Sequence, residues 1–198
     1  MVEVKNAEVF NLERAMRAIN NSFNVGEINT TEGEYKEKLA ENLGGNMQAH
    51  QSHDAYLKGI LVTFDIKGNG VFMPEFQRYH FINCNSIENL DFNNIKFTKY
   101  VTDEEKQILF ELIDNYNKNN NDENYQKILT NLPRGVELWY KVSTNYLQLK
   151  TILIQRFNHK HVEDWIYGFI NWCYSLPKFR ELCGFEDKSW DLNLSKLS

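Results

Sequence analysis

Long apolar runs and paired cysteines are missing from this sequence. The apolar stretches are far too short to cross a bilayer, and no basic segment followed by an apolar run opens the chain as in a secretory signal peptide. The three cysteines, Cys84, Cys173 and Cys183, are odd in number and show no C-x-x-C spacing, which indicates reduced thiols. We therefore expect a cytoplasmic protein with no membrane-embedded segment.

An excess of basic residues is missing too. The 22 lysines and arginines are outnumbered by 27 aspartates and glutamates, which gives a net charge of −5. Duplex nucleic acid is held mainly through its phosphates by clustered basic residues, so we do not expect it as a partner. One local arginine cluster would still be enough to hold the phosphate of a nucleotide.

Motifs of the common catalytic classes are likewise missing. The sequence has no serine hydrolase elbow, glycine-rich phosphate loop or dinucleotide fingerprint, and the turn segment 67–70 is too short for any of them. The histidine pairs His50/His53 and His159/His161 lack the H-E-x-x-H pattern and an evident third ligand. We therefore expect no metal site. If the chain is an enzyme, a bound cofactor performs its chemistry.

What is present is the composition of an ordinary globular protein, with 42% hydrophobic and 25% charged residues. No internal repeat or linker interrupts the chain. This predicts a single domain over residues 1–198, with a loosely packed tail over residues 185–198. Aromatic residues make up 14% of the chain. They favour flat apolar pockets or an extensive subunit contact, and a rich core explains them equally well.

Hydrophobic periodicity predicts both strands and helices. Strands are expected over residues 1–10 and 60–66, and a further strand or extended segment over residues 75–85. Asn11 and Thr102 stand where helix N-caps belong. Helices are expected over residues 12–20, 34–47, 102–116, 123–132 and 162–175, together with a central helix that begins near Val142 or Ser143.

The central helix carries one unusual face. On a helix, Asn145, Leu149, Ile152 and Arg156 fall within about 40° of one another. The apolar middle of this face must pack on a core, which draws the asparagine and the arginine close to that core. A guanidinium in such a place needs an anion or a carboxylate. A structural ion pair and a site for an anionic ligand both satisfy this need.

The asparagine, leucine and arginine of this face resemble the substrate-site helix of the flavin-dependent thymidylate synthases, and more closely that of shorter, phage-encoded relatives of the family. The segment EFQRYHFINCNS adds to the resemblance. Arg78, Tyr79 and His80 occupy the R-H-R places of the family pattern R-H-R-x-x-S-x-N-x-x-S-x-R-Y, and Asn85 matches its asparagine. His53, before the first buried strand, resembles a family histidine.

Several places of the family pattern hold other residues here. Asn83, Glu88, Leu90, Asp91 and Leu147 stand where the family has two serines, an arginine, a tyrosine and a second helix arginine. A glutamate in place of a serine removes a hydroxyl donor from an anion site and adds a like charge.

The resemblance implies an α+β fold, with one domain built from an antiparallel sheet flanked by helices. It implies FAD as cofactor, with NADPH and methylene-tetrahydrofolate as co-substrates, and a homotetramer whose active sites are shared between subunits. It assigns His53, Arg78, His80 and Asn85 to the flavin. Asn145 and Arg156 are assigned to the pyrimidine nucleotide.

Two functions follow from the resemblance. The first is an enzyme of the thymidylate synthase type that methylates dUMP or a related pyrimidine nucleotide. The second is a catalytically inactive phage accessory protein of the same fold that binds a nucleotide or a host protein. The helix residues Asn145 and Arg156 favour a preserved nucleotide pocket, whereas the replaced serine and arginine places favour loss of catalysis.

Overall fold

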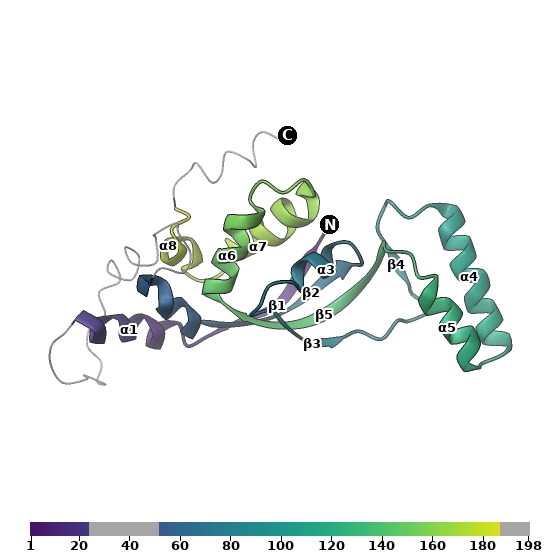
Figure 1. The fold of residues 1–198 in the computed structure, drawn as a ribbon, viewed down its shortest axis with the longest axis horizontal. Coiled ribbons are helices and arrows are strands. Elements are labelled where there is room, and N and C mark those ends of the chain that lie inside the picture. Colours follow the sequence, from purple (N-terminus) through teal and green to yellow (C-terminus); the bar gives the residue numbers. More distant parts are fainter. Residues whose placement is uncertain (24–51, 187–198) are drawn as a thin grey trace.

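The computed structural model describes residues 1–23 and 52–186, whose strands form one antiparallel sheet (Figure 1). Its order is β1 (Glu3–Phe10), β2 (Leu61–Asn69), β5 (Val136–Asn145) and β3 (Asn83–Ile87), and the short β4 (Lys96–Phe97) pairs with the start of β5. β2 and β5 pair along their whole lengths, from Leu61 opposite Asn145 to Asn69 opposite Glu137. These two strands therefore form the centre of the sheet.

One face of the sheet packs on the core. In β2, Val62, Phe64 and Ile66 are buried, while Thr63 and Asp65, which point to the other face, are only half-buried. The short α3 (Phe72–Phe76), α6 (Tyr146–Arg156) and α7 (Asn171–Cys173) lie on the same side of the sheet (Figure 1). The strand predicted over residues 60–66 from its branched and aromatic residues is therefore confirmed as the first part of β2.

Helical turns complete the main core. α1 (Leu12–Phe23) and the 3₁₀ segment η1 (Ser52–Gly59) pack together at one end of the sheet, and α8 (Phe179–Cys183) packs against α6. The π-helical segment η2 (Glu163–Ile170) leads into α7. The aromatic rings are concentrated in this core: Phe72 lies 4.7 Å from Trp165 and Phe76 lies 5.1 Å from Phe169, between ring centroids. The high aromatic content of the sequence thus contributes to the core.

A second, smaller core lies under a helical hairpin. α4 (Asp103–Lys118) and α5 (Asp122–Thr130) project from one end of the sheet (Figure 1). Their buried residues Leu109, Ile113 and Ile128 cluster with Val136 at the start of β5. Thr102 is the predicted N-cap of α4 and forms a capping box: its hydroxyl accepts from the Glu105 amide at 3.2 Å, while the Glu105 carboxylate accepts from the Thr102 amide at 2.8 Å.

The α+β fold with an antiparallel sheet and flanking helices is confirmed, but two segments were predicted wrongly. No helix begins at Val142 or Ser143; these residues belong to β5, and α6 starts at Tyr146. Residues 75–85 are no single extended segment, because they contain the end of α3, a turn and the start of β3. The helix expected over residues 34–47 and the tail beyond residue 186 lie outside the described residues.

Candidate functional site

Arg156, at the end of α6, lies in a polar cluster that also includes α3 and η2. Its Nε donates to the Tyr79 hydroxyl at 2.8 Å, and a terminal nitrogen donates to Glu75 Oε2 at 3.2 Å. Its Cζ lies 4.6 Å from a ring centroid of Trp165, within cation–π range. The Arg156 side chain is only 16% exposed. It therefore meets the carboxylate that its partly buried charge requires.

Glu75 joins three elements through one oxygen. Its Oε2 accepts from Arg156 and, at 3.2 Å, from the indole nitrogen of Trp165, and it lies 3.3 Å from Nε2 of His159. Burial lowers the pKa of His159, and the nearby Glu75 charge opposes that shift only in part. Arg156, Glu75, Tyr79, His159 and Trp165 are called the Arg156 cluster below.

Two of the residues assigned to the flavin lie beside this cluster. Arg78 and His80 are exposed on the turn after α3, where they flank Tyr79. Neither forms an ion pair with any residue that the structure describes. The His80 ring contacts Phe81, with 4.9 Å between centroids. The turn thus presents a guanidinium and an imidazole beside the Tyr79 hydroxyl that Arg156 contacts.

The two asparagines lie elsewhere, along β3 and β5. Asn85 donates to the Ser143 hydroxyl at 3.2 Å, across the β3–β5 pair. Asn145 ends β5, and its side-chain oxygen caps α6 by accepting from the Gln148 amide at 2.9 Å. Among the described residues, no hydrogen bond joins either asparagine to the Arg156 cluster. The backbone of His53 belongs to η1, but its side chain lies outside what the structure describes.

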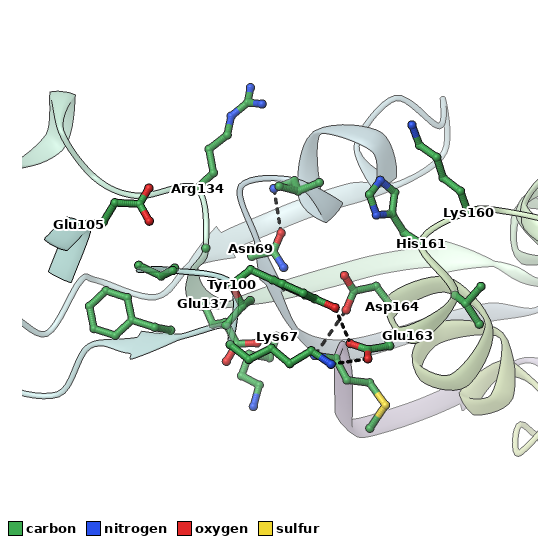
Figure 2. Close-up of a pocket in the computed structure, with 18 residues that line it drawn as sticks. Lys67, Asn69, Tyr100, Glu105, Arg134, Glu137, Lys160, His161, Glu163 and Asp164 are labelled. Atoms are coloured by element: carbon green, nitrogen blue, oxygen red, sulfur yellow. Dashed lines mark hydrogen bonds and ion pairs between the residues drawn. The ribbon is translucent and has the colours of Figure 1, made fainter. Parts of the chain in front are cut away.

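A cavity of about 810 Å³ lies at the other side of the segment 159–165 (Figure 2). It contains none of the six residues that the resemblance assigned to ligands. The walls come from the C-terminal end of β2, the N-terminal end of β5, the loop 97–101 and the turn 160–164. Polar residues that line it include Lys67, Asn69, Tyr100, Arg134, Lys160 and His161, with Glu105, Glu137, Glu163 and Asp164.

Ion pairs close one side of this cavity. Lys99 contacts Glu163 at 2.5 Å, and this hydrogen bond lowers the pKa of Glu163 and raises that of Lys99. The Tyr100 hydroxyl lies 3.4 Å from the same carboxylate. Asp164 accepts from the Val2 amide at 3.0 Å. The two adjacent acids therefore tie the loop 97–101 and the start of β1 to η2.

The segment 159–165 joins the cavity to the Arg156 cluster. His159 and Trp165 contact Glu75, whereas Lys160 to Asp164 line the cavity. The segment runs into the π-helical turn η2, and π-helical turns frequently occur at functional sites. Gly168 on η2 is closely packed, because a Cβ there would lie 2.9 Å from the Val2 carbonyl oxygen. This packing fixes η2 against β1.

Within residues 1–23 and 52–186, no three histidine, cysteine, aspartate or glutamate residues gather as a metal site would require. His161 donates its backbone amide to Nδ1 of His159 at 3.2 Å. His50 lies outside this part of the chain. Of the helices that the structure describes, none has the length and apolar character needed to span a bilayer.

Sequence reasoning missed Glu75 and most of the cavity. A signal for Glu75 was available, since it is the only charged residue of the apolar helix FMPEF. Arg134 and Asn69 gave no comparable signal, because an exposed arginine after a proline and an asparagine in a turn are ordinary features. Arg134 and Asn69 line the same cavity because β2 pairs with β5.

The sequence matches no protein-family model and no curated protein. Solved structures do resemble the fold. A Helicobacter pylori thymidylate synthase X (ThyX) structure with FAD and dUMP matches with a TM-score of 0.66 at 17% identity, over 94% of this chain and 98% of that one. A second structure of the same enzyme, also complexed with FAD and dUMP, gives 0.64 at 18% identity with the same coverage. The chain thus shares the fold of flavin-dependent thymidylate synthases.

Proposed function

We propose that the protein is a flavoprotein of the thymidylate synthase type, which binds FAD and a pyrimidine nucleotide. The observation that carries this proposal is the likeness of nearly the whole chain to enzyme structures that contain FAD and dUMP. If this chain lacked a domain of that enzyme, the match would cover much less of the enzyme. It covers 98% of the enzyme chain and 94% of this one.

The donors on the turn after α3 fit a flavin phosphate. Arg78 and His80 are exposed, lie two residues apart, and have no ion-pair partner among the described residues. They would hold the phosphates of FAD, with Asn85 and His53 as further contacts. When bound, FAD reduced by NADPH supplies hydride to the pyrimidine ring, and methylene-tetrahydrofolate supplies the carbon.

Arg156 would orient the nucleotide from its place in the cluster. Its Nε and one terminal nitrogen are engaged by Tyr79 and Glu75, and a guanidinium has further N–H donors. Trp165 and Tyr79 keep water from its faces. Asn145 uses its oxygen to cap α6, and its amide N–H groups, which have no acceptor in the described part of the chain, would donate to a ligand.

We include in the proposal that copies of the chain associate and share the site. The flavin and nucleotide residues lie in two places in one chain, the Arg156 cluster with its neighbouring turn and the β3–β5 pair. If two copies associate, the Arg156 cluster and its neighbouring turn in one copy would lie next to the β3–β5 residues of the other copy. The expected assembly is a homotetramer.

The test starts from the purified full chain and its visible absorption spectrum. A flavin band, or a rise in melting temperature on addition of FAD, is expected, followed by a further rise with dUMP. Formation of dTMP from dUMP, methylene-tetrahydrofolate and NADPH then tests turnover. Arg78→Ala should weaken FAD binding about tenfold, since charge-assisted hydrogen bonds to phosphate are lost.

The matched control is Arg17→Ala, which removes an exposed arginine on α1 whose partner is Glu13. It should leave FAD binding unchanged. Binding of FAD and dUMP without dTMP formation would identify the inactive accessory protein instead. A colourless protein whose melting temperature neither FAD nor dUMP changes would refute the flavoprotein proposal.

A further inference from the structure

The cavity of Figure 2 contains two cations that no described carboxylate balances. Lys67 contacts Glu3 at 2.6 Å and Lys99 contacts Glu163, so these two lining cations are neutralised. Arg134 and Lys160 have no ion-pair partner within residues 1–23 and 52–186, and both are exposed. They lie on either side of Asn69 in Figure 2. Both are long, exposed side chains, and the Arg134 guanidinium points away from Asn69 in Figure 2, so the charged groups would turn inward to meet one anion.

Asn69 adds a hydrogen-bond donor on a largely buried residue between these cations. The residue is only 7% exposed, and its side-chain oxygen accepts from the Val71 amide at 2.8 Å and the Phe72 amide at 3.0 Å. These bonds fix the amide group, and its NH₂ donates to no acceptor among the described residues. Because Asn69 lines the cavity, its NH₂ can donate to an oxygen of a bound ligand.

The backbone beneath Arg134 is held in place before any ligand arrives. The Arg134 carbonyl accepts from the Gly70 amide at 2.8 Å, and the Gly135 carbonyl accepts from the Thr98 amide at 2.8 Å. Gly135 allows this close packing, because a Cβ there would lie 2.2 Å from a methyl carbon of Val101. Arg134 therefore extends from a fixed base, which lowers the entropy lost on binding.

Tyr100 supplies a flat surface beside these donors. It is 72% exposed and extends across the cavity towards Glu163 (Figure 2). Its hydroxyl contact with Glu163 holds the ring in one position, and aromatic rings stack readily on such a face. The volume of about 810 Å³ is within the range that small-molecule sites occupy.

We propose that this cavity binds a ring-bearing organic phosphate, whose phosphate contacts Arg134, Lys160 and Asn69 and whose ring stacks on Tyr100. The site is separate from the Arg156 cluster. Two of the lining acids are balanced by cations, since Glu163 pairs with Lys99 and Asp164 lies 3.5 Å from the N-terminal ammonium. Glu105 is engaged in the capping box of α4. Glu105 and Glu137 therefore oppose the phosphate, since neither has a cationic partner in the described part of the chain.

The test uses phenyl phosphate as the probe, titrated into the full chain by calorimetry at low salt. Inorganic phosphate lacks the ring and phenol lacks the charge, so both should bind at least about tenfold more weakly than phenyl phosphate. Arg134→Ala and Lys160→Ala should each weaken binding about tenfold. Glu137→Gln should strengthen it, because a like charge is removed.

Asn69→Asp is the sharpest variant. The carboxylate still accepts from Val71 and Phe72, but it replaces the donor with a negative charge, so phenyl phosphate binding should be lost. Lys141→Ala is the matched control, since it removes one exposed lysine from β5 outside the cavity. Its affinity should stay within about twofold of the parent value, because its charge is screened by solvent.

Circular dichroism of each variant establishes that it is folded, and Arg134→Ala and Lys160→Ala alter only exposed side chains. Equal weakening by Lys141→Ala and Arg134→Ala would show general charge attraction and overturn the proposal. So would unchanged binding in Arg134→Ala and Lys160→Ala, or no binding of phenyl phosphate to the parent chain at millimolar concentration.

Discussion

At the scale of single residues, the pairing of Arg156 with Glu75 determines how the cluster responds to mutation. Removing either partner leaves the other charge partly buried, with side chains 16% and 24% exposed. We expect Arg156→Met to lower the free energy of unfolding by about 1–2 kcal/mol, less than for a fully buried pair because water still reaches both groups. Urea denaturation measures this value.

A double-mutant cycle of Arg156→Met and Glu75→Gln separates the energy of the ion pair from the effect of each substitution on its other contacts. The glutamine keeps an acceptor for the Trp165 indole, so the coupling energy reports mainly the ion pair. We expect a coupling of about 1 kcal/mol. Additivity within about 0.3 kcal/mol would show that Arg156 and Glu75 are independent, and would favour a guanidinium held ready for a ligand.

His159 makes the stability of the protein depend on pH. Burial lowers its pKa below the ordinary value near 6.5, so the unfolded chain binds more protons than the folded chain just below that pH. The stabilisation is therefore complete above about pH 6.5 and is lost as the pH falls towards the folded-state pKa.

Denaturation of His159→Gln between about pH 5 and pH 8 checks this sign. The variant should show a smaller loss of stability on acidification than the parent chain, because a glutamine binds no proton. An equal loss in both proteins would assign the pH dependence to other groups. A larger loss in the variant would mean that the contact with Glu75 outweighs burial.

The sequence revealed what Arg156 needed but not which residue supplied it. The apolar neighbours Leu149 and Ile152 are fully buried, so the argument that they draw Arg156 to the core was sound. Glu75 lies 81 positions away, and its contact arises because α3 follows β2 directly while α6 follows β5. Such a pairing depends on sheet register, which single-residue patterns do not contain.

At the scale of elements, the hairpin of α4 and α5 has a core of its own. The N-cap of α4 could be predicted, since Thr102 and Glu105 have the spacing of a capping box. Both hydrogen bonds of that box are present in the structure. Thr102→Ala should cost about 1 kcal/mol, because the Glu105 amide at the start of α4 loses its acceptor.

Hydrogen exchange shows which elements lose stability in Thr102→Ala. Amides of α4 and α5 should exchange faster in Thr102→Ala, whereas those of β2 and β5 should keep the parent rates, because the hairpin packs on the smaller core. Thr130→Ala, at the exposed end of α5, is the control and should change neither set. Faster exchange throughout the sheet would mean that both cores unfold as one unit.

β5 is a strand that was not predicted from the sequence. All four residues from Glu137 to Tyr140 are half-buried, so this part of β5 lacks the regular alternation of buried and less buried residues that β2 has. The helical pattern of residues 146–156 begins immediately after it, and Asn145 both ends the strand and caps the helix. The boundary was therefore placed too early. The bounds of the edge strand β3 were also predicted wrongly, because a turn lies directly before it.

At the scale of the whole molecule, α3, α6 and α7 lie on one side of the sheet (Figure 1), and the opposite face carries an apolar pair. Phe10 and Leu61 are directly opposed in the β1–β2 register and are 45% and 50% exposed. Asn145 is paired with Leu61 from the other side, so it lies on the same face. A second copy that packed on this face would bury the apolar pair beside a residue assigned to the nucleotide.

Leu61→Glu tests whether subunit association and ligand binding depend on this face. A carboxylate buried between two copies would cost more than the roughly 1.5–3 kcal/mol that burial of a leucine contributes, so association should weaken at least about tenfold. Sedimentation velocity should show a smaller species, and FAD should bind more weakly, because the shared site is then incomplete. Ile108→Glu places the same charge on the exposed face of α4, where it should change neither property. If Leu61→Glu and the parent sediment alike and bind FAD equally, copies associate elsewhere and each chain forms its site alone.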